Sequence, residues 1–184
     1  PSIFLYMKLS VITINYNNRD GLRKTVESVV NQTCRDFEYI IIDGGSTDGS
    51  VDVIKQYADK IDYWVSEPDK GIYNAMNKGI AVAKGEYLIF MNSGDCLHCI
   101  DTIANVLPLL AGKDFYVGDI ENESNGKRDV VIFPRELSPK IIVDQIVFRS
   151  IPHQASFIRK SLFEEFGNYR EDLRIASDWY FFYH

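Results

Sequence analysis

The chain has 184 residues, of which 46% are hydrophobic and 25% are charged, and its formal net charge is −6 at pH 7. This length favours one domain with a single core, and the negative charge argues against a general nucleic-acid-binding protein. The three cysteines are an odd and scattered set, which favours reduced thiols over a disulfide framework. No apolar run approaches the length that crosses a bilayer. We therefore expect a single cytoplasmic domain over residues 1–184.

Both ends of the chain are apolar. Residues 1–6 lack the charged start of a signal peptide, and because Met7 and Lys8 lead directly into a strand, we interpret residues 1–6 as added in expression or as an upstream extension. The aromatic run over residues 179–183 is interpreted as the apolar face of a helix that stops at His184, which indicates a piece of a longer protein. If exposed, these rings would be covered by a further helix, by the second subunit of a homodimer, or by peripheral association with the inner face of a membrane.

The first half of the chain alternates strands with helices. Apolar, β-branched strands are predicted at four places, residues 9–14, 39–42, 63–65 and 87–91. Apolar residues at helical spacing follow each of the first three strands, in segments that contain residues 22–30, run to about residue 58, and span 72–83. Gly85 is predicted to stop the third helix in the left-handed C′ position. This βαβαβαβ order is typical of a parallel sheet with helices on both faces.

The pattern changes in the second half of the chain. A helix is predicted over residues 100–110, and strands over 115–118 and 129–133 flank a polar loop. That loop covers residues 121–128. Further elements are predicted as a short helix that opens at 138–139, a strand over 155–158 and a helix over 160–166. No repeat, low-complexity segment or linker divides the chain.

Three acids, Asp43, Asp69 and Asp95, stand at strand or loop ends that a parallel sheet gathers along one edge. One such acid usually caps a turn, but three favour a nucleotide or metal–phosphate site. The chain contains no GxxxxGK[ST] loop, and a polar run at 15–18 replaces the glycine-rich turn after the first strand. These two absences argue against kinases, ATPases and NAD enzymes. A CxxC pair at 96–99 lacks a second pair of ligands at zinc-finger spacing.

The runs SVITINYN (10–17), IIDGGSTD (41–48), DKGIYNAMNKG (69–79), and GEYL with NSGD (85–95) occur in this order. In order and spacing they resemble the family 2 glycosyltransferases. A weaker resemblance to the acceptor-side segment of that family covers PHQASF (152–157), GNY (167–169) and IASDW (175–179). The resemblance implies the GT-A fold, an α/β architecture whose mostly parallel, Rossmann-like sheet has helices on both faces. It also implies a UDP- or GDP-sugar donor, Mn²⁺ or Mg²⁺ on the donor diphosphate, and transfer with inversion to a saccharide or lipid-linked acceptor in surface polysaccharide or glycan biosynthesis.

The resemblance also implies roles for single residues. Asp95 matches the end of the acidic metal motif, and Asp178 matches the acid that serves as general base. In many members of the family, acids stand where this chain has Asn92 and Gly94, so Asp95 is left as the motif's one carboxylate. The residues assigned to the nucleotide and sugar are Thr13, Asn15, Asp43, Lys70, Asn74, Asn77 and Lys78. His153 is assigned to the donor diphosphate or the acceptor, although a single histidine near a strand is more often structural.

The chemistry explains why these residue types are needed. A sugar hydroxyl becomes a competent nucleophile as its proton leaves, and a carboxylate within hydrogen-bond reach can accept that proton. A divalent cation neutralises the charge that builds on the leaving diphosphate. Two other functions stay open: a non-catalytic nucleotide-sugar or glycan-binding module of the same fold, and a nucleotidyltransferase. A nucleotidyltransferase would need a phosphate loop rich in glycine and basic residues after the first strand, and the run at 15–18 is not such a loop.

Overall fold

The computed structural model describes residues 7–124, 126–133, 151–173 and 175–183, with the backbone alone at 179, 182 and 183. Residues 1–6, the helix predicted to open at 138–139, and the rings at 179, 182 and 183 therefore lie outside what the structure describes.

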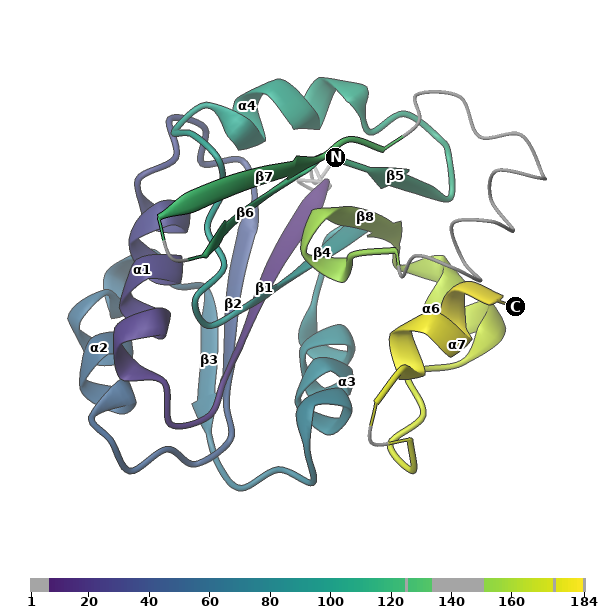
Figure 1. Cartoon of the computed structure of the whole chain (residues 1–184). Helices are drawn as coiled ribbons and strands as arrows, with labels where there is room; N and C mark the ends of the chain where they lie inside the picture. The colour runs from purple at the N-terminus through teal and green to yellow at the C-terminus, as the bar shows by residue number, and fades with distance from the viewer. Residues whose placement is uncertain (1–6, 125, 134–150, 174, 184) are drawn as a thin grey trace, which may run out of the picture.

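Six strands form the central sheet, in the order β3-β2-β1-β4-β8-β5 (Figure 1). β1 lies parallel to β2 and β4, and β2 lies parallel to β3, while β8 runs antiparallel to both of its neighbours. The strands are β1 (Leu9–Asn15), β2 (Glu38–Asp43), β3 (Tyr63–Ser66), β4 (Tyr87–Asn92), β5 (Phe115–Val117) and β8 (Ser156–Arg159). The predicted α/β class and the four parallel strands of the first half are confirmed.

Residues along each strand alternate between the two faces of the sheet, so both faces must be covered. In β1, Val11 joins the core on one face and Ile12 the core on the other. α1, α2 and α4 contribute to the first core, and α3, α6 and α7 to the second (Figure 1). The helices are α1 (Arg19–Val30), α2 (Ser50–Gln56), α3 (Ile72–Val82), α4 (Thr102–Val106), α6 (Ser161–Phe166) and α7 (Ser177–Tyr183), with short 3₁₀ turns η1 (Ala58–Lys60), η2 (Leu107–Leu109) and η3 (His153–Ala155). Of the helices described, none has the length and apolar content that crossing a membrane requires.

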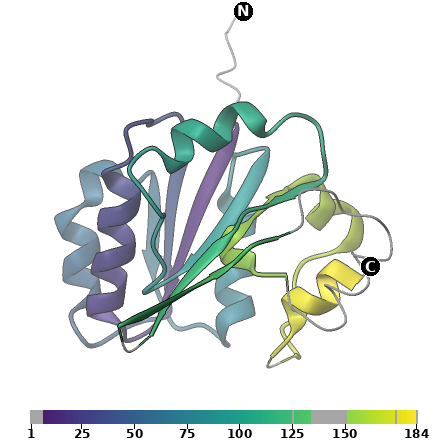
Figure 2. The same cartoon turned by 45° about the horizontal axis from the view of Figure 1, so that its top comes forward.

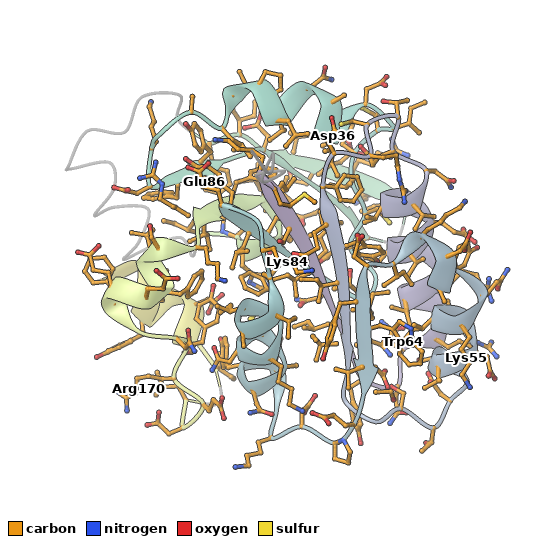
Figure 3. The ribbon with its side chains drawn as sticks, turned by 180° about the vertical axis from the view of Figure 1, so that it is seen from behind. Asp36, Lys55, Trp64, Lys84, Glu86 and Arg170 are labelled. Carbon is orange, nitrogen blue, oxygen red and sulfur yellow. The ribbon has the colours of Figure 1, made fainter. Side chains whose placement is uncertain are left out.

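The turn between α3 and β4 differs from the prediction. α3 ends at Val82, and Gly85 does not have the positive φ of a left-handed C′ residue. Instead, a Cβ atom at Gly85 would lie 2.4 Å from the backbone nitrogen of Ser10. Glycine is needed here because two backbone segments approach closely. Figure 3, which shows the molecule from behind, labels its neighbours Lys84 and Glu86.

The prediction of a polar loop over residues 121–128 is wrong. This segment contains most of a two-stranded hairpin, β6 (Ile120–Ser124) and β7 (Lys127–Val131), which is separate from the central sheet. Opposite charges meet across the hairpin, with Glu123 in register with Arg128, and such cross-strand pairs stabilise strands despite their polarity. Figure 2 shows the hairpin crossing in front of the sheet, below α4.

Candidate active site

The ends of β1, β2 and β3 and the start of α3 lie on the same side of the sheet, at the bottom of Figure 1. We call this side, where the parallel strands end, the edge of the sheet. Asp43, the last residue of β2, is fully buried there. Its Oδ1 accepts hydrogen bonds from Asn15 Nδ2 and Ser46 Oγ, each at 2.6 Å. Its Oδ2 accepts from the backbone N–H of Ser46 at 2.9 Å and from Ser66 Oγ at 2.6 Å. One carboxylate therefore joins the ends of β1, β2 and β3.

These bonds decide the charge of Asp43. Burial by itself would raise the pKa of Asp43, but hydrogen bonds from Ser46, Ser66 and Asn15 outweigh it and lower the pKa below the ordinary value. Asp43 is therefore a carboxylate at neutral pH. Its bonds to these partners are charge-assisted, which makes them stronger than bonds between neutral groups.

Asn15 continues the series of hydrogen bonds toward β4. Its Oδ1 accepts from Ser93 Oγ at 2.7 Å, and Ser93 Oγ also lies 3.1 Å from the carbonyl oxygen of Ile14. Asn18 Nδ2 donates to the carbonyl oxygen of Ser93 at 2.8 Å. The side chains after β1 thus tie the Asp43 cluster to the loop that carries Asp95.

The loop after β4 holds Asp95 in a tight turn. Asp95 Oδ2 accepts the backbone N–H of Asn92 at 2.9 Å, and Thr25 Oγ1 on α1 donates to the carbonyl oxygen of Asp95 at 2.7 Å. Gly94 adopts a φ of 115°, which favours glycine at this position. Burial raises the pKa of the Asp95 carboxyl, and this effect exceeds the opposing effect of the Asn92 N–H.

The residues around Asp95 fit a partial metal site. The described residues contain no group of three His, Cys, Asp or Glu side chains that could hold a metal ion. However, Mg²⁺ is often bound by one or two carboxylates together with substrate phosphates, and a nearby cation would favour the ionised form of Asp95. Asp95 also lines a cavity of about 1120 Å³ whose walls include α4, the β6–β7 hairpin and Gln154. A ligand can therefore approach this loop.

His153 and Asp178 form a pair beside this loop. His153 Nδ1 lies 3.1 Å from Asp178 Oδ2, and the two side chains are 16% and 14% exposed. Tyr73 Oη on α3 donates to the other carboxylate oxygen, Asp178 Oδ1, at 2.9 Å. His153 Nε2 lies 3.0 Å from Asn92 Nδ2, at the end of β4. The predicted base is thus connected through one imidazole ring to the strand that leads to Asp95.

The residues assigned to the nucleotide on α3 contact protein groups. Asn77 Nδ2 donates to the carbonyl oxygen of Tyr169 at 2.9 Å, and its Oδ1 accepts the N–H of Tyr169 at 3.1 Å. Asn74 and Asn77 both donate to the carboxylate of Glu171. These hydrogen bonds lower the pKa of Glu171, and the bond from Asn77 has the larger effect. Lys78 Nζ pairs with Glu67 at 2.8 Å. The hydrogen bonds of Asn74 and Asn77 fasten the segment between α6 and α7 to α3.

The remaining predicted residues lie in different environments. Thr13 is fully buried, and its hydroxyl is 3.1 Å from Tyr39 Oη. The Thr13 hydroxyl therefore lies within the core here, and its assignment to the nucleoside pocket stays a prediction. Lys70 is exposed at the start of α3. Asp69 accepts the N–H of Gly71 at 2.8 Å and so shapes the turn before α3.

Sequence reasoning missed three residues of this arrangement. Ser66 is the last residue of its strand, so the rule that picked out Asp43 could have identified it. Tyr73 was part of the 69–79 motif but had the spacing of a core residue. Glu171 lies in an exposed segment, and nothing in the sequence pointed to it.

Comparison with known proteins identifies the family. Residues 10–167 match the family model described as Glycosyl transferase family 2. The chain belongs to this family. An uncharacterized glycosyltransferase of Mycobacterium tuberculosis is 38% identical to it over 179 residues, which cover 92% of this chain and 65% of the relative. A PGL/p-HBAD biosynthesis glycosyltransferase of Mycobacterium bovis is 33% identical over 179 residues, with 94% and 67% covered. The chain thus spans about two thirds of the length of these relatives.

Solved structures of this family's fold are also similar. A fragment of TarS from S. aureus, residues 1–349 in complex with UDP, superposes with a TM-score of 0.77 at 21% identity, covering 96% of this chain and 54% of that one. The mannosyltransferase PcManGT from Pyrobaculum calidifontis, in complex with GDP-Man and Mn²⁺, has a TM-score of 0.68 at 19% identity and 95% and 50% coverage. At this level of identity the similarity concerns the fold, and this family 2 chain has the GT-A fold.

Proposed function

We propose that this family 2 chain is the catalytic GT-A domain of an inverting, metal-dependent glycosyltransferase. It would move a sugar from a nucleotide-diphosphate sugar to a hydroxyl group of a saccharide or lipid-linked acceptor, in glycan or surface polysaccharide biosynthesis. The observation that carries the proposal is the contact of Asp178 with His153, which in turn contacts Asn92. Two carboxylates with different tasks, Asp178 and Asp95, are thereby linked at one edge of the sheet.

The donor would bind along the edge formed by β1, β2 and β4. Asn15 and Asp43 would line the nucleoside side, and Lys70, Asn74, Asn77 and Lys78 would lie toward the sugar and phosphates. The similar structures contain UDP in one case and GDP-Man with Mn²⁺ in the other, which supports a UDP- or GDP-sugar. When bound, a divalent ion held by Asp95 and the diphosphate would neutralise charge on the leaving group.

Asp178 would act on the acceptor. Its carboxylate accepts the proton of the acceptor hydroxyl while that oxygen forms a bond to the anomeric carbon, on the face opposite the departing nucleotide. The bond from the anomeric carbon to the diphosphate breaks, and its electron pair leaves with the nucleoside diphosphate. One proton, one new C–O bond and one broken C–O bond account for the whole reaction, and inversion follows from attack on the opposite face.

The test measures nucleotide release from UDP- and GDP-sugars in the presence of Mn²⁺, together with calorimetry of UDP and GDP. Asp178→Asn should reduce turnover by roughly two to four orders of magnitude and leave nucleotide affinity nearly unchanged, because the base faces the acceptor. Asp172→Asn, on the exposed segment before α7, is the matched control and should turn over normally. Full activity of Asp178→Asn would refute the assignment of the base.

The second candidate is a non-catalytic binding module, favoured by the single carboxylate of the metal loop. It would bind a nucleoside diphosphate and release no nucleotide from any sugar donor. If neither binding nor release is measured with any donor, both functions are refuted. Cytoplasmic localisation, peripheral membrane association and a homodimer stay predictions that these experiments do not address.

A further inference from the structure

We infer that His153 is a positioning residue: it orients the carboxylate of Asp178 and connects it to the end of β4 through Asn92. This inference rests on the proposed function and changes the role that sequence resemblance gave to His153. Both ring nitrogens of His153 already have protein partners, Asp178 Oδ2 at 3.1 Å and Asn92 Nδ2 at 3.0 Å. The ring therefore has no nitrogen left to contact a diphosphate or an acceptor.

The hydrogen-bond partners fix the proton on the ring. The Asp178 carboxylate can only accept hydrogen bonds, so the ring nitrogen that faces it, Nδ1, carries a proton. Nδ1 then donates to Asp178. Asn92 Nδ2 lies at Nε2, while Asn92 Oδ1 has no hydrogen-bond partner among the described residues. The proton on Nδ1 does not depend on how this amide is turned. It is also directly measurable.

Two elements hold the carboxylate from opposite sides. Tyr73 Oη on α3 donates to Asp178 Oδ1 at 2.9 Å, and His153 in η3 donates to Oδ2. The carboxylate cannot rotate about its Cβ–Cγ bond without breaking both bonds. The alignment of the base thus depends on α3 and η3 rather than on α7 alone.

The position of β8 in the sheet explains how His153 reaches this edge. β8 is antiparallel to β4, with Leu88 in register with Ile158. Residues before an antiparallel strand lie at the edge where residues after a parallel strand lie. η3 precedes β8 directly, and His153 therefore faces the end of β4.

The experiment compares three substitutions of His153 in the same nucleotide-release and calorimetric assays. His153→Ala should lower kcat roughly 10- to 100-fold, because misplacement of a base by about 1 Å can cost that much, while the affinity for UDP with Mn²⁺ stays within about twofold. His153→Asn should recover much of the loss, since its amide N–H can occupy the place of Nδ1–H. His153→Gln carries its amide where Nε2 lies and should recover less. Glu164→Gln, exposed on α6, is the control.

Three outcomes would overturn the inference. The first is unchanged kcat in a folded His153→Ala protein that still binds UDP. The second is a loss of UDP affinity that accounts for the whole effect, which would return His153 to the diphosphate. The third is independent of turnover: ¹⁵N spectra of the histidines should show His153 with its proton on Nδ1, and a proton on Nε2 alone would refute the arrangement. The activity of the wild type and its loss in Asp178→Asn test the proposed function. The His153 variants test the positioning role, so the two proposals can fail independently.

Discussion

Replacing Asp43 by asparagine isolates the charge of the carboxylate that joins β1, β2 and β3. Two of its four donors are fixed. The backbone N–H of Ser46 cannot accept, and the Asn15 amide is held with Nδ2 toward Asp43 because its Oδ1 accepts from Ser93 Oγ, whereas the Ser46 and Ser66 hydroxyls can rotate. One oxygen of Asp43 faces each fixed donor. The new amide nitrogen must therefore meet one of them, whichever way the side chain is turned.

The magnitude follows from these contacts. A hydrogen bond to a charged group contributes about 1.5–3 kcal/mol, and a buried donor left unpaired costs about 1–3 kcal/mol. The lower cost of burying a neutral amide offsets part of this loss. We expect Asp43→Asn to lower the free energy of unfolding by about 3 kcal/mol. Urea denaturation followed by circular dichroism measures it, and Asp36→Asn, an exposed position labelled in Figure 3, is the control.

The pH dependence gives a second measure of the same carboxylate. Because the folded-state pKa of Asp43 is lowered, its contribution to stability is present above the unfolded-state pKa and is lost as the pH falls through the folded-state pKa. The difference in stability between wild type and Asp43→Asn should therefore shrink as the pH falls below the ordinary value of 3.8. A loss under about 1 kcal/mol at pH 7, or a difference that grows in acid, would refute this account.

Two further predictions concern the supports of the site. Asn77→Ala removes both hydrogen bonds to the backbone of Tyr169 and should cost about 1–3 kcal/mol; amide hydrogen exchange should rise first in the segment after α6, and uniform protection would argue against this role. Gly85→Ala places a Cβ 2.4 Å from the nitrogen of Ser10 and should cost about 2 kcal/mol or more. An unchanged melting temperature for Gly85→Ala would show that the close approach is easily relieved.

The first half of the fold could be predicted because its signals are local. Each parallel strand is apolar on both faces and ends in a polar residue, and this pattern is enough to place Asp43 and Asn15 at the edge. The same rule fails for β8, because sequence does not reveal that this strand is antiparallel. That is why His153 could be noticed but not given its contact with Asn92.

β6 and the first two residues of β7 could not be predicted for another reason, whereas residues 129–131 lie in the strand predicted over 129–133. These strands are charged and largely exposed, so neither alternation nor hydrophobicity distinguishes the missed part from a loop. Thr13 shows a different difficulty, since a polar residue in a matching motif is buried and contacts Tyr39 within the core. Motif position indicated the correct edge but not which side chains reach it.

The sheet is joined unevenly on the two sides of β4. The ladder with β1 runs from Tyr87 to Asn92, whereas the ladder with β8 covers Tyr87 and Leu88. η3 is tied instead toward β5, because Gly118 N–H donates to the carbonyl oxygen of Ala155. At the edge itself, Asn92 and His153 meet through a side-chain bond that can break without opening either ladder. The contact between the end of β4 and η3 therefore rests on side chains, and substitution of either side chain should change this contact while both backbone ladders stay formed.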